Sequence, residues 1–157
     1  MTSVRLREAG AADAPALARL LREAFEEFRG RLDPPSSAHG KTAEAVLREL
    51  AGGGALIADV QGAPVGCVFF HPKEDHVYLD RLAVLPAFRG AGVGAALMDA
   101  VEAGAEGLGA VRLSVRLALT EQQRYYARRG YVFHAHGTHA GYDEPTFLVL
   151  QKPLRAG

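Results

Sequence analysis

The sequence of 157 residues lacks several features that common functions require. A single cysteine, Cys67, excludes an intramolecular disulfide and a cysteine metal cluster. The 18 basic and 18 acidic residues cancel, so the basic surplus of most nucleic-acid-binding proteins is missing and we expect no nucleic-acid partner. No apolar run approaches the roughly 20 residues that span a bilayer, and Met1–Arg5 shows no apolar signal segment. We therefore expect a cytoplasmic protein with no membrane partner.

The apolar pattern predicts one domain over residues 1–157, because no repeat, low-complexity tract or linker divides the chain. Short apolar or alternating runs predict strands at Val4–Glu8, Ala55–Val60, Pro64–Phe70, Val77–Leu85, Val111–Leu119, Tyr131–His136 and Thr146–Leu150. Amphipathic spacing predicts helices from Asp13 to Phe28, from Thr42 to the Gly52–Gly54 run, from about Val93 to Gly107, and from Thr120 to Gly130.

The resulting element order is β-α-α-β-β-β-α-β-α-β-β. The strand–helix–strand segment Val77–Leu119 predicts a right-handed crossover between parallel strands, and the remaining strands are expected to pair antiparallel. The predicted fold class is therefore α+β, with a mostly antiparallel mixed sheet, one parallel crossover and helices on both faces. Asp13 and Thr42 are expected to cap helices, and Thr120 with Gln123 has the form of a capping box.

The segment Arg89-Gly90-Ala91-Gly92-Val93-Gly94 follows a predicted strand and opens a predicted helix. Glycine lets the backbone turn sharply and leaves the amide N–H groups open to a bound anion. The start of a helix adds a partial positive charge, and Arg89 adds a full charge that can fork onto phosphate oxygens. The combination favours a pyrophosphate-binding loop.

Two other interpretations of this loop are weighed against the first. Gly90-x-Gly92-x-x-Ala95 also matches the dinucleotide-binding fingerprint, but the next predicted strand, Val111–Leu119, holds no acidic residue for a ribose. The lead-in from Pro86 to Arg89 is also long for such a site. The glycines could otherwise serve close helix packing, although packing alone does not require the arginine.

Two motifs in the chain resemble those of the GCN5-related N-acetyltransferase (GNAT) family. Arg89, Gly92 and Gly94 form its Arg-x-x-Gly-x-Gly signature, preceded by a strand-like Tyr78–Pro86. The later segment Tyr125–Tyr131 resembles the family's "aromatic-Tyr-x-x-x-Gly-aromatic" helix end. The order and separation of the two motifs agree with the family, as does the element order over nearly the whole chain.

The resemblance implies an N-acetyltransferase that uses acetyl-CoA and no metal. An amine would attack the thioester directly, without a covalent enzyme intermediate. Backbone groups of Leu82, Ala83 and Val84 would pair with the pantetheine arm, and one of their N–H groups would polarise the acetyl carbonyl. Arg89, Gly90, Ala91, Gly92, Val93 and Gly94 would bind the pyrophosphate.

The resemblance also implies roles in proton transfer. Tyr126 lies four residues before Gly130, where the family's acid protonates the departing sulfur; the alternative is that Tyr126 is a core aromatic beside Tyr125. Asp80 occupies the place of a glutamate that serves many relatives as base; the alternative is an ion pair with Arg81 or another cation. An asparagine that many members carry near the start of the tyrosine helix is absent, and Gln122 or Gln123 could take its place.

The acceptor is expected to be the amine of a small molecule. In this fold it would enter between residues 29–41 and 134–145, whose slight positive bias would favour a carboxylate or phosphate on the acceptor. A peptide or protein amine is the alternative acceptor, and a non-catalytic acetyl-CoA sensor is the alternative class. A metal site built from His134, His136 and His139 is disfavoured because no carboxylate pattern accompanies them. The resemblance also implies a homodimer, as in many relatives.

Overall fold

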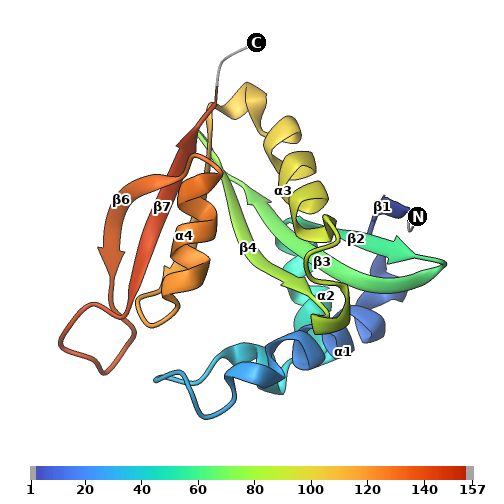
Figure 1. Cartoon of the computed structure of the whole chain (residues 1–157), viewed down its shortest axis with the longest axis horizontal. Helices are drawn as coiled ribbons and strands as arrows, with labels where there is room; N and C mark the ends of the chain where they lie inside the picture. The colour runs from blue at the N-terminus through green and yellow to red at the C-terminus, as the bar shows by residue number, and fades with distance from the viewer. Residues whose placement is uncertain (1–2, 155–157) are drawn as a thin grey trace. The chain divides into compact units, whose positions relative to one another are not determined.

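The computed structural model describes residues 3–154, which divide into two compact units (Figure 1). The first unit holds residues 3–71 and 81–101, and the second holds residues 72–80 and 102–154. Strand β4 (Val77–Val84) belongs to both, because the division falls between Asp80 and Arg81. The strand order is β1-β2-β3-β4-β5-β7-β6. The element order confirms the predicted one, and the single domain stays a prediction.

The strands of the first unit form an antiparallel sheet. Strand β1 (Val4–Glu8) pairs with β2 (Gly54–Val60), and β2 pairs with β3 (Ala63–Pro72). The β2–β3 turn has φ of 52° at Gln61 and 80° at Gly62. Left-handed geometry at both central positions matches the twist of a tight hairpin. The short link Gln61-Gly62-Ala63 between two apolar runs predicts this hairpin, and the antiparallel pairing of β2 with β3 confirms it.

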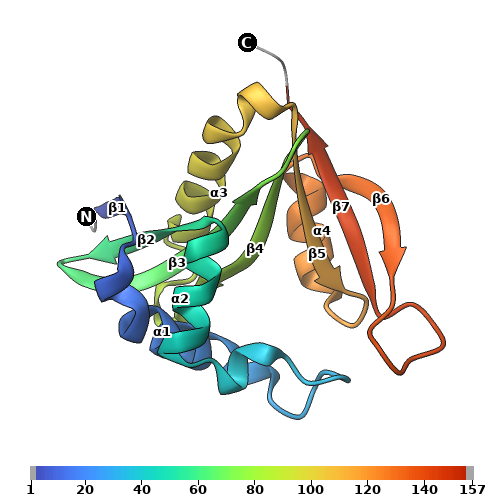
Figure 2. The same cartoon turned by 180° about the vertical axis from the view of Figure 1, so that it is seen from behind.

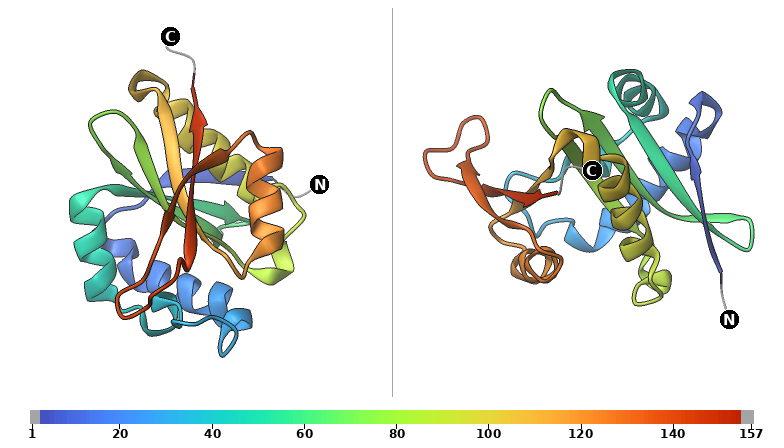
Figure 3. Two further views of the ribbon diagram at one scale, coloured as in Figure 1. Left: turned by 90° about the vertical axis from the view of Figure 1, so that its left-hand side faces the viewer. Right: turned by 90° about the horizontal axis from the view of Figure 1, so that it is seen from above.

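Helices cover both faces of the β2–β3 hairpin. Neighbouring residues of a strand point to opposite faces. Cys67 faces helices α1 (Ala14–Phe25) and α2 (Ala43–Gly52), and a Cβ added at Gly66 would lie 2.8 Å from Val93 of α3 (Val93–Gly104). Figure 3 shows α2 and α3 on opposite sides of β2 and β3. The core on the α1–α2 face contains Leu17, Leu20, Leu21, Ala24, Val46, Ile57, Cys67, Phe69 and Ala83.

The second unit contains the parallel pair. Val77–Leu79 of β4 lie beside Val111–Leu113 of β5 (Ala110–Arg116) in parallel register. Strand β5 pairs antiparallel with β7 (Phe147–Pro153), and β7 pairs antiparallel with β6 (Val132–Gly137), as Figure 2 shows. Helix α4 (Thr120–Arg128) connects β5 to β6. The predicted α+β class, with one parallel crossover in a mostly antiparallel sheet, is confirmed.

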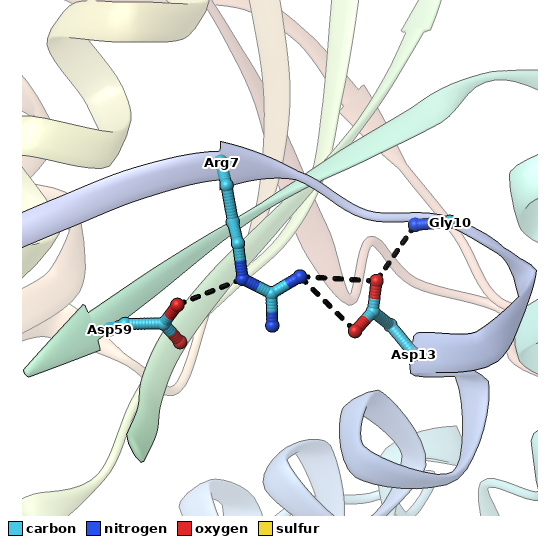
Figure 4. Close-up of polar contacts among 4 residues, drawn as sticks. All are labelled: Arg7, Gly10, Asp13 and Asp59. Carbon is cyan, nitrogen blue, oxygen red and sulfur yellow. Dashed lines mark hydrogen bonds and ion pairs between the residues drawn. The ribbon is translucent and has the colours of Figure 1, made fainter. Parts of the chain in front are cut away.

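The predicted cap at Asp13 is wrong for helix α1. The Asp13 carboxylate accepts a hydrogen bond from the backbone N–H of Gly10 at 2.8 Å and so caps the preceding 3-10 turn, Ala11–Asp13 (Figure 4). Arg7 donates to the same carboxylate at 3.1 Å and to Asp59 of β2 at 2.8 Å. The Gly10 contact, followed by Arg7, lowers the pKa of Asp13 despite its partial burial.

The predicted capping box at Thr120 is also wrong. The N-cap of α4 is Leu119, and the Gln123 side chain donates to the backbone carbonyls of Arg116 and Leu117 at 3.0 Å each. The amide therefore satisfies carbonyls where β5 ends instead of the helix start. Thr42 does cap α2, since its hydroxyl accepts from the Ala45 N–H at 3.2 Å.

Several predicted elements end earlier than their patterns suggest. Helix α1 stops at Phe25 and continues as the 3-10 turn Glu26–Phe28, and α3 stops at Gly104. The apolar spacing of α2 predicts that Val46 and Leu47 both face inward. Val46 is buried, but Leu47 is exposed, because the turn of α2 that buries Val46 directs its neighbour outward. No helix among residues 3–154 is long and apolar enough to cross a membrane.

Candidate active site

The glycine-rich loop lies in the first unit, between β4 and α3. After the 3-10 turn Pro86–Phe88, the backbone is left-handed at Gly90 (φ 80°) and Gly92 (φ 85°), and α3 begins at Val93. The residues that the structure describes leave open space within 4 Å of a Cβ built at either glycine. Glycine is therefore favoured at both positions by backbone conformation and not by crowding.

The start of α3 supplies the hydrogen-bond donors of the loop. The carbonyl of Gly92 accepts from the N–H of Ala96 at 3.0 Å, so the helical ladder begins there. The first N–H groups of a helix have no acceptor within the helix and carry its positive end. Val93 is buried and anchors the helix start, whereas Gly90, Ala91 and Gly92 are exposed and Gly94 is half-buried. The loop can therefore bind an anion through its backbone.

The Arg89 guanidinium contacts protein groups through all three of its nitrogens. Nη1 lies 2.6 Å from Oε1 of Glu27, Nη2 donates to the carbonyl of Ala24 at 3.2 Å, and Nε donates to the carbonyl of Val84 at 3.2 Å. The structure thus joins the end of β4 to the end of α1 through this residue. A phosphate contact of Arg89 stays a prediction.

The middle of β4 is distorted at Arg81, whose φ is 59°. A non-glycine residue in the left-handed region costs roughly 1–2 kcal/mol, and here the Arg81 guanidinium is held by the hydroxyl of Ser37. Leu82 and Val84 are half-buried and Ala83 is buried. Asp80, just before the distortion, is half-buried and belongs to the second unit.

Tyr126 lies on α4 in the second unit, between two other tyrosines. Its ring makes edge-to-face contacts with Tyr125 at 5.5 Å and with Tyr131 at 5.9 Å between centroids. Burial, helped by the neighbouring Tyr125, raises the pKa of Tyr126 to about 12. The phenol therefore stays protonated at neutral pH, as a general acid must before it acts.

A buried carboxylate near Tyr126 escaped the sequence predictions. Glu102 of α3 accepts from Tyr131 Oη at 2.9 Å, from Lys152 Nζ at 2.8 Å and from Arg129 Nη2 at 3.3 Å. Burial and the Glu102 carboxylate raise the pKa of Tyr131, whose ring packs on Tyr126. The signal in the sequence was an acid four residues after the apolar Met98, and therefore on the same side of α3.

His134 and His136 lie on β6, and His139 lies in the loop that follows it. His139 Nδ1 lies 2.5 Å from Thr146 Oγ1, and burial lowers the pKa of His139. A bulge between Phe133 and Ala135 interrupts the alternation of β6 at His134. Within residues 3–154 no group of three histidine, cysteine or acidic side chains is placed to hold a metal ion.

The chain matches a family of acetyltransferases over most of its length. Residues 15–131, which include both motifs, match the model of the acetyltransferase (GNAT) family. The chain therefore belongs to the GNAT acetyltransferase family, as its motifs predicted. No curated protein matches the chain.

Solved structures support the same fold. A GCN5-related N-acetyltransferase from Rhodopseudomonas palustris is 27% identical, with 98% of each chain covered and a TM-score of 0.76. The PaiA N-acetyltransferase from Thermoplasma acidophilum, in complex with coenzyme A, is 16% identical, with 96% of this chain and 99% of that chain covered and a TM-score of 0.76. A GNAT acetyltransferase from Elizabethkingia anophelis with acetyl-CoA bound is 17% identical, with 96% and 98% covered and a TM-score of 0.69. The last two likenesses concern the fold alone.

Proposed function

We propose that this acetyltransferase moves the acetyl group of acetyl-CoA directly to the primary amine of a small molecule. The observation that carries the proposal is the loop Arg89–Gly94, whose residues Arg89–Gly92 are exposed and which has two left-handed glycines at the start of α3. The fit is supported by the open space at Gly90 and Gly92 within the described residues, because a bulky phosphate needs close access to the backbone. Related folds that hold coenzyme A or acetyl-CoA support the same ligand.

The proposed binding mode uses the backbone of two consecutive segments. The N–H groups of the loop and of the first turn of α3 bind the pyrophosphate. Backbone groups of Leu82, Ala83 and Val84 pair with the pantetheine arm as an added strand would, and one of their N–H groups polarises the acetyl carbonyl. Strand β4 pairs with β5 over Val77–Leu79, so Leu82, Ala83 and Val84 follow the part of β4 that is paired with β5.

The proposed chemistry assigns the proton transfers to two side chains. Asp80 accepts a proton from the ammonium form of the acceptor, directly or through water, and the free amine nitrogen then attacks the carbonyl carbon. As the carbon–sulfur bond breaks, the sulfur takes the bonding electrons and receives a proton from the Tyr126 hydroxyl. The nitrogen, which is cationic once it has bonded to carbon, gives its second proton to the Tyr126 phenolate through water, so the amide is neutral and the phenol is restored. Because burial raises the pKa of Tyr126 to about 12, the hydroxyl carries its proton at neutral pH when the thiolate departs.

The proposal is tested by calorimetry and by release of the coenzyme A thiol. We expect heat of binding with acetyl-CoA, and turnover with some members of a panel of small amines that includes carboxylate-bearing ones. Turnover restricted to peptides would replace the small acceptor by a protein amine, and binding without any turnover would indicate a sensor. Absence of binding heat would overturn the assignment of the loop. The homodimer and the cytoplasmic location stay predictions.

A pair of variants tests the proposed acid. Tyr126→Phe should lower kcat by roughly 100-fold or more, since general acid catalysis contributes about 10²–10⁴. Tyr125→Phe is the matched control, because the Tyr125 hydroxyl is buried and has no hydrogen-bond partner among residues 3–154. Equal rates for wild type and Tyr126→Phe would reject the acid role, and loss in Tyr125→Phe alone would transfer it to the neighbour.

A further inference from the structure

The Arg89 side chain, where the glycine-rich loop begins, contacts oxygen atoms of the protein. A guanidinium binds a phosphate most strongly through a pair of parallel N–H donors directed at it. Here each of the three nitrogens already contacts a protein oxygen, and two of these oxygens lie at the end of α1, more than 60 residues earlier in the chain. The guanidinium is thus directed at α1 and β4.

We propose that Glu27 is a positioning residue for coenzyme A, and that Arg89 acts by tying the loop to Glu27 and to the end of α1. The inference rests on the proposed function of the loop. The Ala24 carbonyl lies in the last turn of α1, where helical carbonyls lack partners and attract a cation. The Val84 carbonyl closes β4, so the same side chain fixes the residue from which the loop departs.

The charge of Glu27 makes the tie stronger than two carbonyls alone. Charged pairs give shorter and stronger hydrogen bonds, and the contact between Glu27 and Arg89 is the shortest of the three, at 2.6 Å. Both side chains keep about a third of their surface or more in solvent, 36% for Glu27 and 40% for Arg89, so each variant should fold. The expected effect is therefore on loop geometry and ligand affinity.

The neighbouring Glu26 offers a matched control. It lies in the same 3-10 turn and pairs with Arg29 at 2.8 Å, on the exposed surface and away from the loop. Glu26→Gln removes one negative charge at nearly the same place as Glu27→Gln. Any long-range effect of that charge on an anionic ligand is therefore common to both variants, and only Glu27→Gln removes the tie.

The first test is calorimetric titration of the full chain with coenzyme A. We expect Glu27→Gln to raise Kd by roughly two- to five-fold, the range for a partly exposed ion pair, and Glu26→Gln to leave it unchanged. Arg89→Ala should raise Kd by about ten-fold or more, Arg89→Lys should not restore it, and Glu27→Gln should add nothing in the Arg89→Ala background. Thermal unfolding should stay close to that of wild type for Glu27→Gln.

Three results would overturn the inference. Tighter binding by Glu27→Gln would mean that Glu27 competes with the pyrophosphate for Arg89. Full rescue by Arg89→Lys would mean that Arg89 supplies charge to the phosphate directly, and equal Kd values for Glu27→Gln and wild type would mean that the ion pair is idle. If wild type gives no binding heat, the proposed function of the loop fails as well, and the inference fails with it.

A second measurement needs no ligand. Amide hydrogen exchange of a peptide covering residues 86–96 reports how firmly the loop is held. We expect faster exchange in Glu27→Gln and in Arg89→Ala than in wild type and Glu26→Gln. Unchanged exchange in both loop variants would contradict the tie whatever the affinity for coenzyme A.

Discussion

The buried carboxylate of Glu102 allows a quantitative prediction of stability. Its side chain is 11% exposed, and it faces two cations, Lys152 at 27% and Arg129 at 16% exposure, as well as the Tyr131 hydroxyl. Glu102→Gln keeps the size of the side chain but removes the negative charge that both cations contact. Removing one partner of a buried ion pair costs about 3–5 kcal/mol. Because Lys152 can turn toward water, we expect the lower end, about 3 kcal/mol of the free energy of unfolding.

Tyr131→Phe separates the hydrogen bond from the charges. It removes one bond to an ionised acceptor and keeps the ring that packs on Tyr126, so about 1.5–3 kcal/mol should be lost. Urea unfolding followed by circular dichroism measures both values, and the slope with urea should not change. The control is Glu106→Gln in the exposed turn after α3, expected within about 0.5 kcal/mol of wild type. A loss below about 1 kcal/mol for Glu102→Gln would refute the reasoning.

Three further predictions concern pH and packing. The folded state raises the pKa of Tyr126 from 10.0 to about 12, so the contribution of the protonated Tyr126 to stability is complete below pH 10 and is lost toward pH 12. Near pH 11 the loss in the free energy of unfolding is about 1.4 kcal/mol. Urea unfolding of Tyr126→Phe should lack this loss. The pKa of Asp13 is lowered, chiefly by the Gly10 N–H, so the stability that Asp13 contributes is present above the unfolded pKa of 3.8 and is lost as pH falls through the folded pKa. Thermal melts should show Asp13→Asn to be less stable than wild type near neutral pH and nearly equal to it at strongly acidic pH. The same difference in stability at both pH values would contradict this prediction. Gly66→Ala places a Cβ 2.8 Å from a side chain of α3 and should cost about 1–3 kcal/mol in urea unfolding, whereas Gly104→Ala, in open space among the described residues, should be neutral or gain up to about 1 kcal/mol.

The local patterns of the chain predicted the elements and their order well. The apolar periodicity places each strand and helix within a few residues, and the tight Gln61-Gly62 turn and the Thr42 cap were readable from short segments. The capping predictions at Asp13 and Thr120 are wrong, because the side chains of Asp13 and Gln123 form hydrogen bonds with other backbone groups. The Gly10 N–H lies within reach of Asp13, and carbonyls at the end of β5 lie within reach of Gln123.

The site was predictable where a backbone conformation selects one residue type. Gly90 and Gly92 adopt left-handed backbone that favours glycine, so the glycine pattern in the sequence is enough to predict the loop. The partners of Arg89 could not be predicted from the sequence, because Glu27 and Ala24 lie 62 and 65 residues away and only folding brings them together with Arg89. Arg81 gives no signal either, since arginine is not a residue type that marks left-handed backbone and its contact, Ser37, lies 44 residues away in the chain.

The burial of the lone thiol has a practical consequence for the study of this enzyme. Cys67 is 0% exposed, and burial raises its pKa far above the usual value, so it carries almost no thiolate at neutral pH. Thiolates, and not thiols, react with disulfide and maleimide reagents. The native chain should therefore not react with such reagents, and the signal in a thiol-release assay would come from the thiol of coenzyme A alone. A cysteine introduced at an exposed position would then be a single labelling site, without any need to replace the native one.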